Sequence, residues 1–337
     1  MNKKMKKLIS KEDSFFVAGH NGMVGSAVIR SLKKKGYCSE KYSGKLFTAD
    51  KKDVDLRDFK NVLKWFKKNK PRIVILAAAK VGGILANQNY PFDFISDNLR
   101  IQQNVIESAW ETGCKRFMFL GSSCIYPKNS KTPIKEEELL KSKLEKTNEP
   151  YAIAKIAGIK LCEALRKQHG FDAISLMPTN LYGTNDNYDL QNSHVLPALV
   201  RKFFEAKMKR KTYITCWGTG NPTREFLHVD DLADAIIHCL EFWDPNHSDA
   251  PKNYAGEKLN YLNVGSGFEI SIKDLAHEIA NCINYKGKII WDSEMPDGTF
   301  RKNLDCSRIK SLGWESKISL KNGLRMTIEE FRRNFKN

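Results

Sequence analysis

The sequence contains no long uncharged apolar run and no apolar segment near its start. No stretch approaches the roughly 20 apolar residues that a membrane-spanning helix needs, so we expect no membrane contact. Four of the first seven residues are lysines, and Leu8-Ile9 is followed at once by polar and charged residues, which excludes the apolar core of a signal peptide. We therefore expect a cytoplasmic protein.

Paired cysteines are also missing. The chain has 8 cysteines, but none forms a C-x-x-C pair, and none is spaced with a histidine as metal ligands usually are. This pattern is typical of reduced thiols in a cytosolic enzyme. We expect no metal site.

Acidic residues are fewer than basic ones, 39 against 56, which leaves a formal net charge of +17. A basic surface attracts phosphate groups at long range, so nucleic acid is one candidate partner. The excess is spread along the whole chain, however, and no nucleic-acid-binding motif is present. We favour a lysine-rich composition with sites for small anionic molecules, and we expect no nucleic-acid partner.

The chain shows no internal repeat and no low-complexity segment. Its 337 residues are enough for a sizeable core and for either two domains or one domain with a large lobe built from insertions. Its 41% hydrophobic content is that of a globular protein.

The first motif is a glycine-rich turn after a short apolar run. Residues 14–18 predict a strand, Gly19, Gly22 and Gly25 follow at equal spacing, and residues 26–35 have a helical pattern. Glycines in this context permit a tight turn and a close approach of the backbone to a pyrophosphate, which then faces the start of the helix. The motif predicts a dinucleotide-binding site.

The end of the second predicted strand, residues 45–50, gives a mixed signal on the type of dinucleotide. An acidic residue there favours NAD, whereas basic residues bind the additional phosphate of NADP. Asp50 is followed directly by Lys51 and Lys52. We favour NADP(H), with the alternative that both lysines are solvated loop charges.

Strands and helices alternate through the first half of the chain. Further strands are expected at residues 71–79, 117–120 and 173–177, with helices at 55–69, 98–113 and 151–169 and an exposed loop at 128–149. This alternation predicts an α/β protein with a doubly wound, mostly parallel sheet of the Rossmann type.

The second half of the chain predicts a smaller lobe. Helices are expected at 195–208, after 228 and at 272–283, with strands at 212–216, 261–264 and 289–291, and Asp230 or Asp231 is suited to cap the helix after 228. We assign residues 1–180 to a dinucleotide-binding domain completed by 225–262. Residues 181–224 and 263–337 form a C-terminal α/β substrate lobe.

A second motif places Tyr151 and Lys155 one turn apart on a predicted helix, after a strand that ends near Ser122. An ammonium beside a phenol favours the phenolate, so we expect Lys155 to lower the pKa of Tyr151 toward neutral pH. Such a tyrosine exchanges a proton with a sugar oxygen, held by the Ser122 hydroxyl, while a hydride moves at the adjoining carbon. This arrangement resembles the acid/base core of short-chain dehydrogenases/reductases.

Eight motifs between Gly19 and Thr299 resemble those of the GDP-L-fucose synthases, an extended short-chain dehydrogenase/reductase family that couples epimerisation to reduction. They are Gly-His-x-Gly-Met-Val-Gly-Ser-Ala, Ala-Ala-Lys-Val-Gly-Gly-Ile, Gly-Ser-Ser-Cys-Ile-Tyr-Pro, Asn-Glu-Pro-Tyr-Ala-Ile-Ala-Lys, Met-Pro-Thr-Asn-Leu-Tyr-Gly, Asn-Ser-His-Val, Arg-Glu-Phe-Leu-His-Val-Asp-Asp and Pro-Asp-Gly-Thr. Many members of this family have Arg where this chain has Asn21, and some have Arg at Lys51, so selectivity for NADP is expected to be looser here.

The resemblance implies roles at matching positions. Tyr151 would give a proton to the C4 oxygen, Lys155 would be its partner and Ser122 would orient the oxygen. Cys124 and His194 would be the base and the acid of epimerisation. The cofactor would be lined by Gly19, Gly22, Met23, Val24, Gly25, Lys51, Lys52, Ala78, Lys155, Pro178, Asn180, Leu181 and His194. The sugar nucleotide would be held by Lys202, Trp217, Arg224 and Asp297.

The implied substrate is a GDP-4-keto-6-deoxy-mannose, and the implied assembly is a homodimer. Two alternatives stay open. One keeps the chemistry but uses another GDP-4-keto sugar, a heptose or a 3,6-dideoxy sugar, or retains only one of the two steps. The other is a non-catalytic relative that senses nucleotides and binds RNA; loss of Tyr151 or Lys155 would indicate it, and both are present.

Overall fold

A computed structural model describes residues 7–190, 192–295 and 297–335 of the protein. Residues 1–6, which include three of the N-terminal lysines, and Pro296 of the Pro-Asp-Gly-Thr motif lie outside the described residues.

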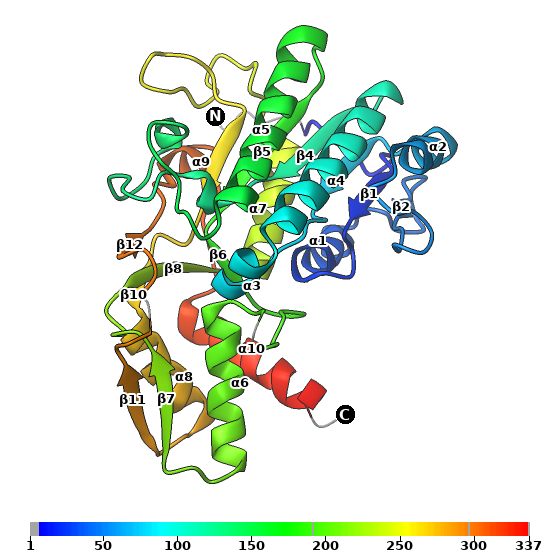
Figure 1. Ribbon diagram of the computed structural model, residues 1–337. Coiled ribbons are helices and arrows are strands. Elements are labelled where there is room, and N and C mark those ends of the chain that lie inside the picture. Colours follow the sequence, from blue (N-terminus) through cyan, green and yellow to red (C-terminus); the bar gives the residue numbers. More distant parts are fainter. Residues whose placement is uncertain (1–6, 191, 296, 336–337) are drawn as a thin grey trace, which may run out of the picture.

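A six-stranded sheet, in which every pairing is parallel, forms the centre of the larger part (Figure 1). In spatial order the strands are β2 (Leu46–Phe47), β1 (Phe15–Ala18), β3 (Ile73–Leu76), β4 (Arg116–Leu120), β5 (Ala173–Pro178) and β9 (Tyr261–Val264). All residues of β1, β3, β4 and β5 are buried, as expected for a parallel sheet covered on both faces. The strand order reverses between β1 and β3, and ligands bind at such a point at the carboxyl ends of the strands. The predicted fold class is confirmed.

Helices cover the sheet (Figure 1). Helices α1 (Met23–Lys34) and α7 (Val229–Phe242) pack against each other. Helix α4 (Pro91–Glu111) packs between α2 (Phe59–Asn69) and α5 (Glu149–His169). Helix α5 ends at Gly170, whose φ of +68° is the left-handed conformation common after a helix end. The long α5 carries Tyr151 and Lys155 in its first two turns and places them beside the end of β4.

A smaller lobe with its own core lies at one end of this sheet (Figure 1). Strand β8 (Thr223–His228) pairs with β6 (Asn180–Tyr182), β10 (Glu269–Ser271) and β12 (Arg301–Lys302), while β7 (Tyr213–Trp217) pairs with β11 (Lys288–Asp292). The lobe's helices are α6 (Val195–Met208), α8 (Ile272–Ile283) and α10 (Leu320–Phe335). Short elements complete the fold: α3 (Ile84–Asn89), α9 (Ser307–Ser311) and the 3₁₀ turns η1 (Ser123–Ile125) and η2 (Glu136–Glu138).

Two predictions about local structure are wrong. The cap of α7 is His228, whose Nδ1 accepts a hydrogen bond of 3.2 Å from the Asp230 N–H, so neither aspartate is the cap. The segment 128–149 is not wholly an exposed loop, because Glu136 is buried. Its carboxylate accepts the Asn263 N–H at 2.9 Å and forms an ion pair with Arg308, so the buried charge is paired.

The strands β6, β8, β10 and β12 and the helix α3 were not predicted, since these short segments lack the continuous apolar run that marks the buried strands of the central sheet. They matter for the site because β8 and β12 carry Arg224 and Lys302. Buried Glu225, next to Arg224, accepts the N–H groups of Gly267 at 2.7 Å and Leu304 at 3.0 Å. These hydrogen bonds join β8 to the segment before β10 and to the segment after β12.

Candidate active site

The glycine turn between β1 and α1 brings backbone into contact with backbone. A Cβ atom on Gly25 would lie 2.1 Å from the Gly19 carbonyl oxygen, and one on Gly19, whose φ is +84°, would lie 2.6 Å from the Ala78 nitrogen. Gly22 caps α1, and Met23 and Val24 form its first turn, where amide groups point toward an anion. The turn therefore fits the pyrophosphate of a dinucleotide, with Ala78 at the end of β3 beside it.

At the end of β2, Asp50 is held by the same turn. Its Oδ1 accepts a hydrogen bond of 2.7 Å from the Asn21 side chain and lies 3.6 Å from Nε2 of His20. Lys51 and Lys52 follow in an exposed turn. The carboxylate of Asp50, held by the turn, and two exposed cations therefore lie together where the adenosine ribose of a dinucleotide binds.

Strand β4 and helix α5 bring Ser122, Cys124 and Tyr151 together. Ser122 lies two residues after the end of the strand and caps η1, since its Oγ accepts the Cys124 N–H at 3.2 Å. A side-chain hydrogen bond with Ser122 and the nearby Cys124 thiol both act on the phenol of Tyr151. The Tyr151 ring lies edge-on to Phe94, with 6.3 Å between ring centroids.

Burial, followed by the nearby Cys124, raises the pKa of Tyr151 well above its usual value. The prediction that Lys155 lowers this pKa is therefore wrong. The Lys155 ammonium lies 5.9 Å from the centroid of the phenol ring and is buried, and burial lowers its own pKa to about 8. The phenol thus keeps its proton at neutral pH, which is the form that a proton donor needs.

The segment after β5 joins the sheet to the lobe. Pro178 is the last residue of β5, and Asn180 and Leu181 form β6 beside β8. The Asn180 amide donates to the Glu225 carbonyl oxygen at 2.9 Å. These residues follow the carboxyl end of β5, where the fold places a bound dinucleotide.

His194 caps the N-terminus of α6. The residue is exposed to solvent, yet the protein around the imidazole desolvates it enough to lower its pKa, and repulsion from Lys302 lowers it further. The Lys302 ammonium itself lies 3.6 Å from Sγ of Cys124. Lys302 therefore connects the two residues that the family resemblance assigns to epimerisation.

The lobe contributes further groups to this region. Arg224 interacts electrostatically with Asp297 and with Cys124, so the lobe and the end of β4 meet here. Both oxygens of the Asp297 carboxylate accept from Thr219, Oδ1 at 3.0 Å from the backbone nitrogen and Oδ2 at 2.7 Å from the hydroxyl. Lys202 donates to the Thr215 carbonyl at 2.7 Å, and the Trp217 residue is 52% exposed.

Lys302 was not predicted as a site residue, although it lies only three residues after Thr299 of the Pro-Asp-Gly-Thr motif. It belongs to a two-residue strand in a lysine-rich chain, so nothing local distinguishes it from the other lysines. Only the pairing of β12 with β8, which sets Lys302 opposite Arg224, reveals its place.

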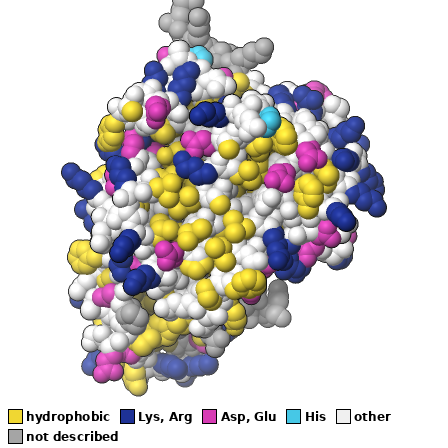
Figure 2. Space-filling model, turned by 45° about the horizontal axis from the view of Figure 1, so that its top comes forward, with side chains coloured by type: hydrophobic (Ala, Val, Ile, Leu, Met, Phe, Trp, Pro, Cys, Tyr) yellow, Lys and Arg dark blue, Asp and Glu magenta, His cyan; other side chains and the backbone are white. Residues whose placement is uncertain are grey.

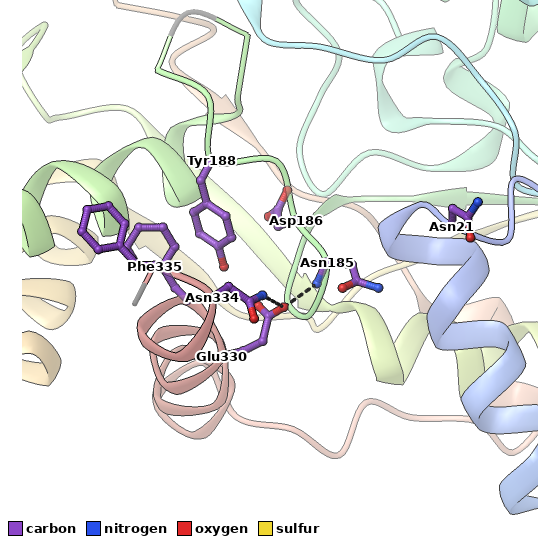
Figure 3. A pocket seen from close by; sticks show the side chains of 8 residues that line it. Asn21, Asn185, Asp186, Tyr188, Glu330, Asn334 and Phe335 are labelled. Atoms are coloured by element: carbon purple, nitrogen blue, oxygen red, sulfur yellow. Dashed lines mark hydrogen bonds between the residues drawn. The ribbon is translucent and has the colours of Figure 1, made fainter. Parts of the chain in front are cut away.

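A separate pocket lies between α10 and the loop after β6 (Figure 3), and none of its lining residues is a predicted catalytic or substrate-binding residue. Asn21 of the glycine turn forms part of its wall. Burial and repulsion from Glu330 raise the pKa of Asp186 in this pocket to about 7. Asn185 links the pocket to α1 through a hydrogen bond of 3.0 Å to the Ser26 hydroxyl.

On the face shown in Figure 2, Lys and Arg side chains are scattered among acidic and hydrophobic ones and do not form one stripe. Within the described residues, no helix is long and apolar enough to cross a membrane. The same residues hold no group of three or more His, Cys, Asp or Glu side chains arranged for a metal ion.

Comparisons with known proteins agree with this geometry. The model of the NAD dependent epimerase/dehydratase family matches residues 15–254. GDP-L-fucose synthase 1 of Arabidopsis thaliana is 51% identical over 324 residues, 96% of this chain and 94% of that protein. GDP-L-fucose synthase of Escherichia coli is 47% identical over 323 residues, 95% and 96% of the two chains. The GDP-mannoheptose C4 reductase MlghC of Campylobacter jejuni, solved with NADP bound, has a TM-score of 0.84 and 35% identity and covers 96% of this chain and 99% of its own.

Proposed function

The chain belongs to the NAD dependent epimerase/dehydratase family, and from this premise we propose that it makes GDP-L-fucose from a GDP-4-keto-6-deoxy-mannose in two steps, 3,5-epimerisation and NADPH-dependent 4-reduction. The observation that carries the proposal is the position of Cys124. A reductase needs only Tyr151, Lys155, Ser122 and a cofactor site. Here a thiol lies beside Tyr151 and within the electrostatic reach of Arg224, where a second acid/base group would meet the same sugar.

The chemistry of epimerisation indicates the roles of the Cys124 thiol and the His194 imidazole. Protons on C3 and C5 flank the C4 ketone and are acidic because the resulting carbanion is an enolate. Cys124 as thiolate removes such a proton, and His194 returns one to the opposite face of the ring, which inverts the centre. Two groups on different elements, η1 and α6, suit the two faces of the sugar.

Reduction uses the groups of β4 and α5. The hydride for C4 comes from the reduced cofactor when it is bound. Tyr151, protonated at neutral pH, gives its proton to the C4 oxygen, and the Ser122 hydroxyl holds that oxygen. Lys155, a cation below pH of about 8, stabilises the phenolate that remains.

We assign the cofactor to the glycine turn, Ala78, Pro178, Asn180 and Leu181, with NADPH preferred because the exposed Lys51 and Lys52 can meet the added phosphate. The NADP-bound reductase at 35% identity supports this choice. The sugar nucleotide lies toward the lobe, with Arg224 and Lys202 supplying positive charge, Trp217 an exposed ring and Asp297 a carboxylate.

We propose the domain division that the sequence predicts: residues 1–180 with 225–262 hold the cofactor, and 181–224 with 263–337 hold the sugar nucleotide. We also propose a homodimer in the cytoplasm. Support for the dimer comes from exposed apolar side chains before and on the helices α4 and α5, including Phe92 at 73% and Ile153 at 42% exposure. Light scattering coupled to size-exclusion chromatography tests it, and a monomer mass would reject it.

A second candidate keeps the chemistry and changes the sugar, since the GDP-mannoheptose reductase shares the fold at 35% identity. The deciding experiment incubates the purified protein with NADPH and, in parallel, GDP-4-keto-6-deoxy-mannose, a GDP-4-keto heptose and a GDP-4-keto-3,6-dideoxy sugar. Product configuration at C3, C4 and C5 is read by NMR. The proposal expects the L-galacto product from the first substrate at the highest kcat/KM, and a faster heptose reaction would favour the second candidate.

A further inference from the structure

Lys302 lies on a strand whose two residues point in opposite directions. Arg301 pairs with Glu269 on β10, with 2.6 Å between Nη2 and Oε2, whereas the half-buried Lys302 donates to Sγ of Cys124 at 3.6 Å. Strand β12 pairs in parallel with β8, so Lys302 stands opposite Arg224. Strand β12 therefore places the Lys302 ammonium beside the Cys124 thiol and directs the Arg301 guanidinium away from that thiol.

Four elements carry the titratable and charged groups around Cys124 and its cation. Lys302 of β12 and Arg224 of β8 are cationic, Tyr151 of α5 is neutral, and His194 of α6 lies in the field of Lys302. Two carboxylates reach these cations but are engaged elsewhere. Asp297, near Arg224, accepts two hydrogen bonds from Thr219. Glu145, near Lys302, pairs with Lys128 at 2.9 Å.

We propose that Lys302 is a positioning residue for epimerisation, which holds the Cys124 thiolate ready to accept a carbon proton and which sets the pH range of the step. This inference rests on the proposed function, because it names the group that prepares the base of that reaction. A cation beside a cysteine favours the thiolate, and a hydrogen bond to a charged group is stronger than one to a neutral group.

The proton inventory of the step is balanced. The Cys124 sulfur forms an S–H bond with the proton from C3 or C5, and the C–H electron pair moves into the enolate. His194 gives up an N–H proton to the opposite face of the same carbon, and the ketone is restored. Lys302 keeps all its protons throughout. Its hydrogen bond to Cys124 is to a charged thiolate before the transfer and to a neutral thiol after it, so only the strength of that bond changes.

The Lys302 ammonium acts on both groups that transfer protons in the epimerisation, the Cys124 thiol and the His194 imidazole. It favours the thiolate, and it disfavours the imidazolium of His194, whose pKa it lowers. A neutral residue at position 302 should therefore move both limbs of the pH profile of epimerisation to higher pH.

The first test needs no substrate. Wild type, Lys302→Met, Lys302→Arg and the matched control Arg301→Met are treated with iodoacetamide at pH 7, and alkylation of the Cys124 peptide is followed by mass spectrometry. The other seven thiols serve as internal references. We expect Lys302→Met to slow alkylation of Cys124 roughly 10- to 100-fold, the range for losing a hydrogen bond to a charged group, while Lys302→Arg restores most of it and Arg301→Met has the wild-type rate.

The second test follows deuterium uptake at C3 and C5 of the 4-keto sugar in D₂O without NADPH, from pH 6 to 10, at saturating sugar. In Lys302→Met the maximal rate should fall and both limbs should shift to higher pH. An increase in KM with unchanged alkylation and unchanged pH limbs would overturn the inference, since it would make Lys302 a substrate-binding cation only. Circular dichroism and NADPH binding confirm that each variant is folded.

The two experiments distinguish a failure of the proposed function from a failure of the role proposed for Lys302. Absence of deuterium uptake in the wild type on all three sugars would reject the proposed function, whatever the alkylation shows. Wild-type uptake with equal Cys124 alkylation in wild type and Lys302→Met would reject only the role of Lys302.

Discussion

The Nζ atom of Lys155 donates a hydrogen bond of 2.8 Å to the carbonyl oxygen of Leu120. Leu120 is the last residue of β4, and Lys155 lies in the second turn of α5, so this contact fastens the helix that carries Tyr151 to the strand that delivers Ser122. The ammonium also lies 5.9 Å from the centroid of the Tyr151 ring, and burial is the largest influence on the pKa of that phenol. Lys155 thus has a structural partner besides its part in catalysis.

Tyr151→Phe should remove most reduction and leave NADPH binding nearly intact, because only the transferable proton is lost. General acid catalysis contributes roughly 10² to 10⁴ in rate, so kcat should fall by that range. Single-turnover oxidation of NADPH measures the step, and fluorescence titration of NADPH is the control. A kcat within about a factor of two of wild type would reject Tyr151 as the acid.

The reduction rate should fall as the pH rises through about 8, where the buried Lys155 loses its proton. The direction follows from its lowered pKa: Lys155 is a cation below that pH and neutral above it, while Tyr151 stays protonated throughout. Lys155→Arg, which stays charged, should shift this limb beyond pH 10. The measurement is kcat for NADPH oxidation against pH, and an unchanged limb in Lys155→Arg would show that another group titrates.

Asp186→Asn should stabilise the protein at pH 8 more than at pH 5. The folded-state pKa of Asp186, about 7, lies above the value near 3.9 for an unfolded chain. A raised carboxyl pKa gives stability that is complete below about pH 4 and is lost as the pH rises through about 7, a change of at most roughly 4 kcal/mol. Asparagine removes the charge and keeps the acceptor for the Asn187 N–H.

Urea unfolding at both pH values measures the effect of Asp186→Asn. Glu40→Gln is the control, since Glu40 is exposed to solvent, and it should change stability equally at the two pH values. Equal stabilisation by Asp186→Asn at pH 5 and pH 8 would contradict the raised pKa.

NADPH should be preferred to NADH, and Lys51→Ala combined with Lys52→Ala should reduce that preference. Each charge-assisted contact to the added phosphate contributes about 1.5–3 kcal/mol at most. The preference should be modest because Asp50, held by Asn21, repels the same phosphate. Steady-state kcat/KM for both cofactors tests this, with Lys67→Ala on α2 as a control. Equal values in the wild type would reject the preference.

The sequence predicted those parts of the fold and site that local patterns encode. The glycine turn, the buried strands and the Tyr151–Lys155 spacing depend on a few neighbouring residues, and strand β9 and helix α8 were predicted to the residue. The expected pKa of Tyr151 was wrong because a spacing of four residues places two side chains on one face of a helix but does not state how deeply they are buried or what else they bond.

Tertiary contacts account for what the sequence did not predict. Lys302 reaches Cys124 across 178 positions, through pairing of a two-residue strand. Glu136 is buried only because Arg308 and the Asn263 N–H meet it from distant segments. Such pairings have no local signature in a single sequence.

The most direct test of the account is deuterium uptake from D₂O into C3 and C5 of GDP-4-keto-6-deoxy-mannose without NADPH, compared among wild type, Cys124→Ser and His194→Gln. Serine keeps the size of the side chain but does not ionise usefully, and glutamine keeps hydrogen bonding without a titratable donor. The account predicts uptake at both carbons in the wild type and far less in both variants, which, given NADPH, should reduce the unepimerised ketone. Wild-type uptake in both variants would contradict it and leave Cys124 and His194 with structural roles.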